Sequence, residues 1–214
     1  MKLFFSLSLL LFFSSFGWAQ EAVPGPLVYD ILREGQRIGQ QTIAFEKQDN
    51  KLMVHTQSDL VVTVLGVPVY RFRQKMEETW VDDKLQSLQS SALDDGTQKD
   101  LSLIRVGNIL TGTYNGQPKS LDGSLLPSTL WHPDSPKASR ILDVVSGRSR
   151  VTMVQNVGQD MVSIAGRNIP AMHFRFSGQF KRDAWYDEKK RLVKAVLTAK
   201  DGSEVTEQLA KLSD

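Results

Sequence analysis

A strict two-residue alternation between Tyr70 and Trp80 constrains the fold more than any other feature of this sequence. The even positions carry Tyr70, Phe72, Gln74, Met76, Glu78 and Trp80. The odd positions between them carry basic residues, one glutamate and one threonine. Successive side chains of a strand point to opposite faces, so this pattern predicts a β-strand with one apolar and one charged face. We expect a second sheet or a ligand to cover the apolar face.

Short segments of the same kind recur along the chain, separated by turn residues. Strands are expected at 27–33, 37–47, 52–60, 85–93, 100–106, 109–114, 161–165, 169–176, 180–186, 192–199 and 205–212. Asp95-Gly96 and Asn115-Gly116 supply the positive φ angles that tight hairpins require. About twelve short strands at even spacing predict an all-β, mainly antiparallel fold. We expect a large curved sheet or a half-open barrel with a short helix or loop as its lid.

Two parts of the chain, 66–106 and 166–212, form a weak internal repeat. Both contain the same Pro-to-Phe spacing, and the Trp-Val-Asp sequence at Trp80 returns as Trp-Tyr-Asp at Trp185. The second copy has three extra residues between its Phe and its Trp. An odd insertion reverses the facing of a strand, so a β-bulge is expected near 177–178. Two similar half-sheets around one site and a chance likeness both remain open.

Residues 1–19 have the pattern of a secretory signal peptide. Lys2 precedes a run of Leu, Phe and Ser, and Gly17-Trp18-Ala19 offers small residues for cleavage. An uncleaved anchor is the alternative. We expect an exported, periplasmic protein with a flexible leader at 20–26 and a single antiparallel β domain at 27–214. No later segment is apolar for long enough to be a transmembrane helix.

The amino-acid composition limits the kinds of site and partner that this chain can have. The chain of 214 residues has no Cys, which excludes disulfides and thiolate sites, and its formal net charge is +2. A near-neutral chain argues against nucleic-acid binding. The three histidines have no metal-ligand spacing, and His55 and His173 are expected on solvated faces. Asp82-Asp83 and Asp94-Asp95 are typical of turns, so we expect no metal and no cofactor.

The segment 60–69 interrupts the alternation because it is apolar on both sides. Such a run is expected to be buried on both faces or to line a cavity. Gly66 and Pro68 are expected to bend it.

The segment 125–135 is bounded by prolines and shows no alternation, so we expect a loop or a single helical turn there. A short helix over 135–142 and a hairpin of 140–145 with 148–157 are the alternatives for the next part of the chain, and the hairpin is favoured. Ser128, His132 and Asp134 have the residue types of a catalytic triad. A lid with Trp131 as its plug is the preferred interpretation.

Glu78 and Gln74 lie on the apolar side of the central strand. A buried polar group without a partner costs about 1–3 kcal/mol. The two residues are therefore expected either at a wet edge of the sheet or opposite a partner. Arg175 or Arg182 of the second repeat is the candidate partner of Glu78, and structural pairing is favoured over ligand binding.

Three motifs carry a family resemblance: Gly-Val-Pro-Val-Tyr-Arg at 66–71, Leu-Pro at 126–127 followed by Trp131-x-Pro133, and Trp-Tyr-Asp at 185–187. The chain resembles an exported proteobacterial family described only as a domain of unknown function. Its implied architecture is similar to the half-open antiparallel barrels of periplasmic lipoprotein carriers. The resemblance implies no catalytic residues.

A non-catalytic binding or carrier protein for an apolar or lipid-like ligand is the first functional hypothesis. The residues expected to line its concave face are Tyr70, Phe72, Met76, Glu78, Trp80, Trp131, His132, Trp185 and Tyr186. The alternative is a structural or protein-interaction module of the envelope with a self-filled core. A hydrolase that uses Ser128 or His132 is the least favoured hypothesis.

Overall fold

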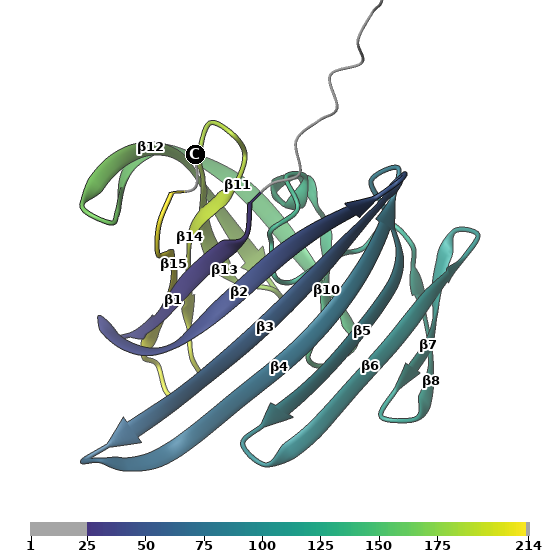
Figure 1. Cartoon of the computed structure of the whole chain (residues 1–214), viewed down its shortest axis with the longest axis horizontal. Helices are drawn as coiled ribbons and strands as arrows, with labels where there is room; N and C mark the ends of the chain where they lie inside the picture. Colours follow the sequence, from purple (N-terminus) through teal and green to yellow (C-terminus); the bar gives the residue numbers. More distant parts are fainter. Residues whose placement is uncertain (1–24, 213–214) are drawn as a thin grey trace, which may run out of the picture.

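The computed structural model describes residues 25–212, and these residues form one 15-stranded sheet (Figure 1). The strand order runs from β8 back to β1, continues through β15, and then runs back to β9. All neighbouring pairs are antiparallel except β9 and β10. The pairing of β1 with β15 joins the two halves of the chain at the centre of the sheet. The predicted all-β, mainly antiparallel architecture is confirmed.

The strands are β1 Leu27–Arg33, β2 Gln36–Gln48, β3 Lys51–Val64, β4 Val67–Val81, β5 Lys84–Asp94, β6 Thr97–Val106, β7 Ile109–Tyr114, β8 Gln117–Asp122, β9 Leu126–Pro127, β10 Arg140–Asp143, β11 Arg148–Ile164, β12 Arg167–Gly178, β13 Arg182–Tyr186, β14 Leu192–Thr198 and β15 Glu204–Leu209. One 3-10 turn, η1, covers Ser135–Lys137. The predicted signal peptide at 1–19 lies outside the described residues.

The alternation in β4 produces the two faces that the sequence predicts. Gln74, Met76, Glu78 and Trp80 are buried, whereas Lys75 and Glu77 between them, and Arg71 and Arg73 before them, are exposed. The buried face belongs to the interior around which the sheet curls, and the charged face is the outer surface. Val54 of β3 and Leu88 of β5 flank this face and are fully buried.

The connection from β8 to β10, residues 123–139, fills much of the interior, and we call it the lid loop. Leu125, Leu130 and Trp131 of this loop belong to the same buried cluster as Trp80 and Tyr186 of the sheet. The favoured hairpin is also present, because β10 pairs with β11, while the helical alternative is reduced to the three residues of η1.

The observed strands differ from the predicted ones in several places. β8 and β9 are additional short edge strands whose residues carry weak β patterns. β11 runs without interruption through the gap left between the expected segments 148–157 and 161–165. Gly158, at φ +129, lies at a bulge between Asn156 and Gly158 that keeps the strand paired. The bulge expected near 177–178 is wrong: those residues are in register, and the other shift on this side lies at Trp185 and Tyr186.

The prediction for the apolar run 60–69 is also wrong. The run forms the tip of the β3–β4 hairpin, with Leu65 and Gly66 in the turn, and Leu65 is 99% exposed. β2 accompanies β3 only as far as Leu60, and β5 accompanies β4 only from Phe72 onward. The tip is therefore exposed because no neighbouring strand extends far enough to cover it, and it projects at the lower left of Figure 1.

Candidate functional site

A buried carboxylate lies at the centre of the predicted apolar face. Glu78 is 2% exposed, and its carboxylate accepts hydrogen bonds from Trp80 Nε1 at 2.7 Å and from Trp131 Nε1 at 3.2 Å. Burial raises the pKa of Glu78 to about 7, although the two indole N–H groups act to lower it. Two indoles therefore satisfy the carboxylate, one from the sheet and one from the lid loop.

The predicted partners of Glu78 are wrong. Arg175 Nε bonds Asp183 at 2.9 Å, and Arg182 bonds Glu207 at 3.1 Å. Arg175 is exposed, on the face opposite to the buried Phe176. It therefore cannot reach a carboxylate on the inner face.

An aromatic cluster surrounds the carboxylate. Trp80 stacks on His132 with ring centroids 4.9 Å apart, and it meets Trp131 edge-on at 5.4 Å. Phe45 adds a further edge contact to Trp131 at 5.3 Å. His132 is 5% exposed, and burial lowers its pKa. The four rings pack against one another, and two of them, Trp80 and Trp131, contact Glu78.

Hydrogen bonds fasten the lid loop to the other half of the sheet. The hydroxyl of Tyr186 in β13 donates to the carbonyl of Leu130 at 2.9 Å. Leu130 adopts a positive φ of 58° and is fully buried, which turns its carbonyl toward this strand. Ser128 N also donates to the carbonyl of Leu142 in β10 at 2.9 Å. The loop is thus held by β4 through Glu78 and by β13 through Tyr186.

Six of the nine residues expected to line a concave site lie in this buried interior: Met76, Glu78, Trp80, Trp131, His132 and Tyr186. Two others, Tyr70 and Phe72, are half-buried on the same face, closer to the hairpin tip. The Tyr70 hydroxyl donates to Asp94 at 2.7 Å.

The ninth, Trp185, lies on the opposite face from the one expected, because its neighbours Ala184 and Tyr186 point inward. Its indole donates to Asp160 at 2.8 Å and stacks on His173 at 4.2 Å. The predicted facing is wrong because the insertion before Trp185 reverses the alternation. A hollow of about 370 Å³ lies beside it and is lined by Asp160, Met161, Val162, Ser163, Trp185, Lys194 and Gln208.

His173 is likewise not the solvated residue that the sequence predicts. It is 7% exposed, because Trp185 covers its ring and Asp183 Oδ1 lies 2.6 Å from its Nε2. Within residues 25–212, no three acidic or histidine side chains are arranged to hold a metal ion.

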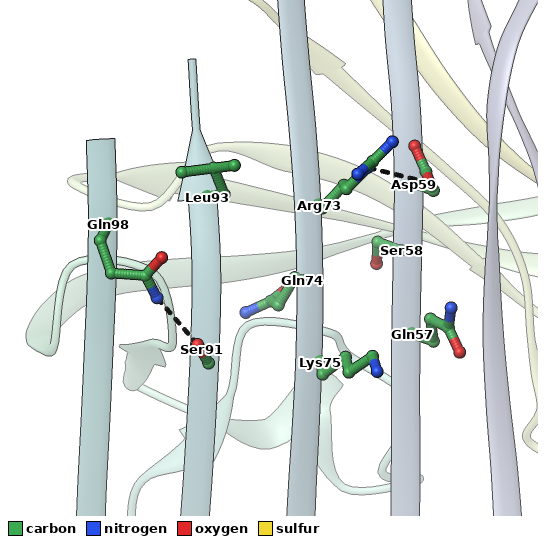
Figure 2. Close-up of a pocket in the computed structure, with 9 residues that line it drawn as sticks. All are labelled: Gln57, Ser58, Asp59, Arg73, Gln74, Lys75, Ser91, Leu93 and Gln98. Carbon is green, nitrogen blue, oxygen red and sulfur yellow. Dashed lines mark hydrogen bonds and ion pairs between the residues drawn. The ribbon is translucent and has the colours of Figure 1, made fainter. Parts of the chain in front are cut away.

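A second hollow of about 220 Å³ lies on β3, β4, β5 and β6 (Figure 2). Arg73 pairs with Asp59 at 3.3 Å beside it, and Gln98 Nε2 donates to Ser91 at 2.8 Å. The aromatic cluster of the lid loop lines neither of these two hollows.

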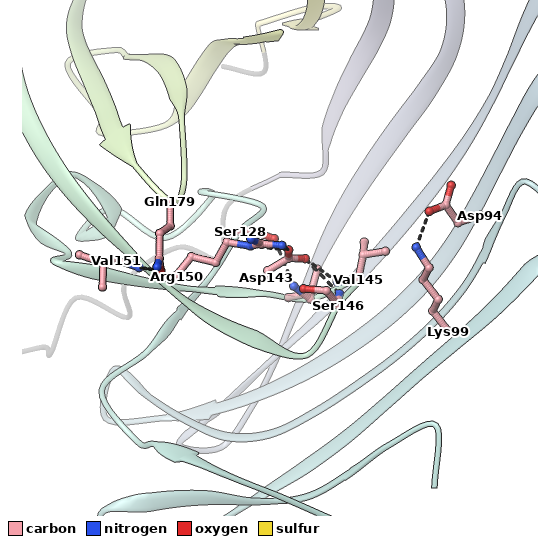
Figure 3. Close-up of polar contacts among 10 residues, drawn as sticks. Asp94, Lys99, Ser128, Asp143, Val145, Ser146, Arg150, Val151 and Gln179 are labelled. Carbon is pink, nitrogen blue, oxygen red and sulfur yellow. Dashed lines mark hydrogen bonds and ion pairs between the residues drawn. The ribbon is translucent and has the colours of Figure 1, made fainter. Parts of the chain in front are cut away.

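Ser128 is part of a structural polar network rather than a pair with His132 (Figure 3). Its hydroxyl accepts from Val144 N at 3.3 Å, while His132 Nδ1 accepts from Asp134 N at 3.2 Å. Asp143 beside Ser128 is bonded by Arg150 Nε at 2.9 Å. Burial acts to raise the pKa of Asp143, but its hydrogen bonds outweigh burial and lower it.

The fold and its interior define an open, barrel-like antiparallel domain that is filled by its own lid loop. The chain belongs to the family described as a domain of unknown function, DUF6134, whose profile matches residues 29–210. The prediction of a family without an assigned function is therefore confirmed. No curated protein sequence matches the chain.

A solved structure supports the fold. The chain is similar to the crystal structure of a beta-barrel-like protein of the domain of unknown function DUF1849 from Brucella abortus. The TM-score is 0.58 at 10% sequence identity, and the similarity covers 89% of this chain and 97% of that chain. At this identity the likeness concerns the fold alone. Among residues 25–212, no helix is long and apolar enough to cross a membrane.

Sequence reasoning misses the anchoring groups of the lid loop and the exposed hairpin tip. Tyr186 is expected to line a ligand site, and the carbonyl of Leu130 carries no signal in the sequence. The signal available for the tip is Gly66, because Gly at the second central position supplies the positive φ that a two-residue hairpin turn requires.

Proposed function

We propose that this protein is a non-catalytic binding module of the bacterial envelope that acts through its outer surface. The observation that carries the proposal is the filled interior, in which Trp131 and His132 of the lid loop pack on Trp80 and Glu78. A side chain that is already covered by the chain itself gains nothing from an added apolar ligand. The signal-like sequence at 1–19 supports the envelope as its location.

Catalysis is no part of this proposal. Ser128 Oγ accepts a backbone hydrogen bond, and the His132 ring is sandwiched in the aromatic cluster. A nucleophile and its base must lie within hydrogen-bond reach of each other, and these two residues have other partners.

A carrier of apolar ligands is the second candidate, and one observation favours it. Tyr70 and Phe72 are only half-buried on the inner face, and Gln41 Nε2 on this face is buried without a hydrogen-bond partner among residues 25–212. An acyl chain with a polar head could contact these groups from the open end of the sheet.

Native mass spectrometry of the protein purified from the periplasm separates the two candidates. The binding module with a filled interior predicts the mass of the polypeptide alone, with no extractable lipid. A stoichiometric lipid adduct that is lost in the Phe72→Ala variant would establish the carrier and contradict the first proposal. The Ile104→Ala variant, at an exposed apolar position on β6, is the matched control.

A further inference from the structure

The β3–β4 ribbon, residues 61–71, extends beyond the rest of the sheet. Beyond Leu60 in β3 and before Phe72 in β4, the two strands pair only with each other. One further hydrogen bond reaches the ribbon, from Asp95 N to Arg71 O at 2.8 Å. The ribbon therefore has two strand edges and two faces that neighbouring strands leave uncovered.

Large apolar side chains concentrate at the end of this ribbon. Four of them lie within six positions, with exposed fractions of 50% for Val64, 99% for Leu65, 61% for Val67 and 53% for Val69. Soluble proteins rarely group exposed apolar residues in this way without a binding role. These side chains surround the tip rather than forming one flat face.

A large apolar residue occupies the left-handed position of the turn at the tip. Leu65 has a φ of 49°, whereas similar angles immediately before a glycine are held by the polar residues Glu34, Asp95 and Asn115 and by the small residue Ala165. Polar residues, above all Asn and Asp, favour this left-handed conformation, whereas Leu is disfavoured there. Local stability would thus select a polar residue, and a local rule broken without a structural gain is expected at functional sites.

The type of side chain changes in order along the ribbon, from apolar at the tip to basic at its base. The apolar tip gives way to Tyr70, and then to Arg71, Arg73 and Lys75, all exposed on the outer face of β4. Arg71 makes no side-chain hydrogen bond or ion pair within the part of the chain that the structure describes. The distance from Val67 to Val69 is about 7 Å at about 3.3 Å per residue.

This order matches the depth profile of a bilayer surface. Apolar groups of peripheral proteins enter about 5–10 Å, tyrosines lie at the headgroups, and basic residues pair with anionic lipids. We propose that the β3–β4 ribbon inserts its tip into the interface of an anionic phospholipid membrane. The inference rests on the proposed function, in that binding takes place at the outer surface, and it names the partner.

Vesicle flotation tests the ribbon with a matched pair of variants. Leu65→Asn replaces the apolar tip by a residue that suits its φ, and Ala165→Asn introduces the same residue at φ 48° in the β11–β12 turn. The protein should float with vesicles of phosphatidylethanolamine and phosphatidylglycerol. Leu65→Asn should lower the partition coefficient at least about tenfold, because burying a Leu side chain in lipid is worth more than a tenfold change. Ala165→Asn should leave it unchanged.

The absence of native Cys permits a direct readout of depth. An environment-sensitive dye on Leu65→Cys should shift to shorter wavelength when these vesicles are added, and the same dye on Ala165→Cys should not. Absence of flotation, or equal partition of Leu65→Asn and the parent, would overturn the proposal. A shift that needs no vesicles and grows with protein concentration would assign the tip to a second copy of the chain and would also overturn it.

These results are independent of the test of the interior. A lipid adduct found by native mass spectrometry would contradict the filled interior. It would not change the conclusion that vesicle flotation gives for the ribbon. Loss of vesicle binding alone would contradict the ribbon and leave the interior closed.

Discussion

At the scale of single residues, Glu78 shows how a buried charge can be kept in an apolar interior. Desolvation penalises the ionised form, and the two indole donors offset part of that penalty. The bonds from Trp80 and Trp131 join the sheet to the lid loop through one side chain. The protonation state of Glu78 should therefore be coupled to folding.

The pKa of Glu78 is about 7 in the folded protein and about 4.5 in the unfolded chain. Between these values the folded state binds more protons, so the free energy of unfolding should fall as pH rises from about 4.5 to above 7. The difference corresponds to roughly 3 kcal/mol. In Glu78→Gln this contribution should disappear, and denaturant unfolding at several pH values measures it.

Glu77→Gln is the control, because Glu77 is exposed on the outer face. The contribution of His132, whose lowered pKa acts in the opposite direction, is present in all three proteins and cancels in the comparison. Parallel pH profiles for the parent and Glu78→Gln would show that the carboxylate is not coupled to folding.

At the scale of elements, the strands could be predicted and the contacts of the lid loop could not. β1 and β7 have the predicted bounds, and β4 has the predicted faces, because period-two alternation is a local property. The partner of Glu78 depends on a loop that is 53 positions away in sequence, and no local pattern encodes it. The face on which Trp185 lies was predicted wrongly for a related reason. It depends on where the strands accommodate the three-residue insertion before Trp185, which no local pattern encodes.

The anchoring of the lid loop by Tyr186 gives a prediction at this scale. Tyr186→Phe leaves the buried carbonyl of Leu130 without its donor, which should lower the free energy of unfolding by about 1–3 kcal/mol. Thermal or denaturant unfolding measures the change. Tyr114→Phe is the matched control, because no hydrogen bond of the Tyr114 hydroxyl exists among the described residues. Equal stability of both variants would contradict the anchor.

A second element-scale prediction concerns the β10–β11 turn. Gly147 has a φ of 61°, and an added Cβ would lie 2.9 Å from the ring of Tyr114 in β7. Gly147→Ala should therefore destabilise the protein by more than about 1 kcal/mol, a typical cost for Ala at positive φ. Gly116→Ala, at φ 76° with open space around it, isolates the backbone part of this cost. A smaller loss in Gly147→Ala than in Gly116→Ala would contradict the packing of the turn on Tyr114.

At the scale of the whole molecule, the pairing of β1 with β15 makes two half-sheets into one structure. The Tyr29 hydroxyl in β1 donates to the carbonyl of Leu192 in β14 at 2.9 Å, and both residues are buried. The lid loop adds a second connection between the halves. Similarity to another barrel-like domain at 10% identity shows that this arrangement tolerates very different sequences.

A continuous sheet with a shared core should unfold in a single transition. Trp80 and Trp185 lie in different halves, so tryptophan fluorescence and far-ultraviolet circular dichroism should give the same midpoint of unfolding. Two separated transitions would indicate that the halves fold independently.

The central claim is that the lid loop is a fixed part of the interior, not a gate over an empty site. Hydrogen exchange followed by mass spectrometry tests it at the amides of Ser128, Leu130 and Ser135, which donate to backbone carbonyls. We predict that peptides of the lid loop are protected as strongly as those of β4, with or without added lipid. Rapid exchange of the loop while β4 stays protected would contradict the claim.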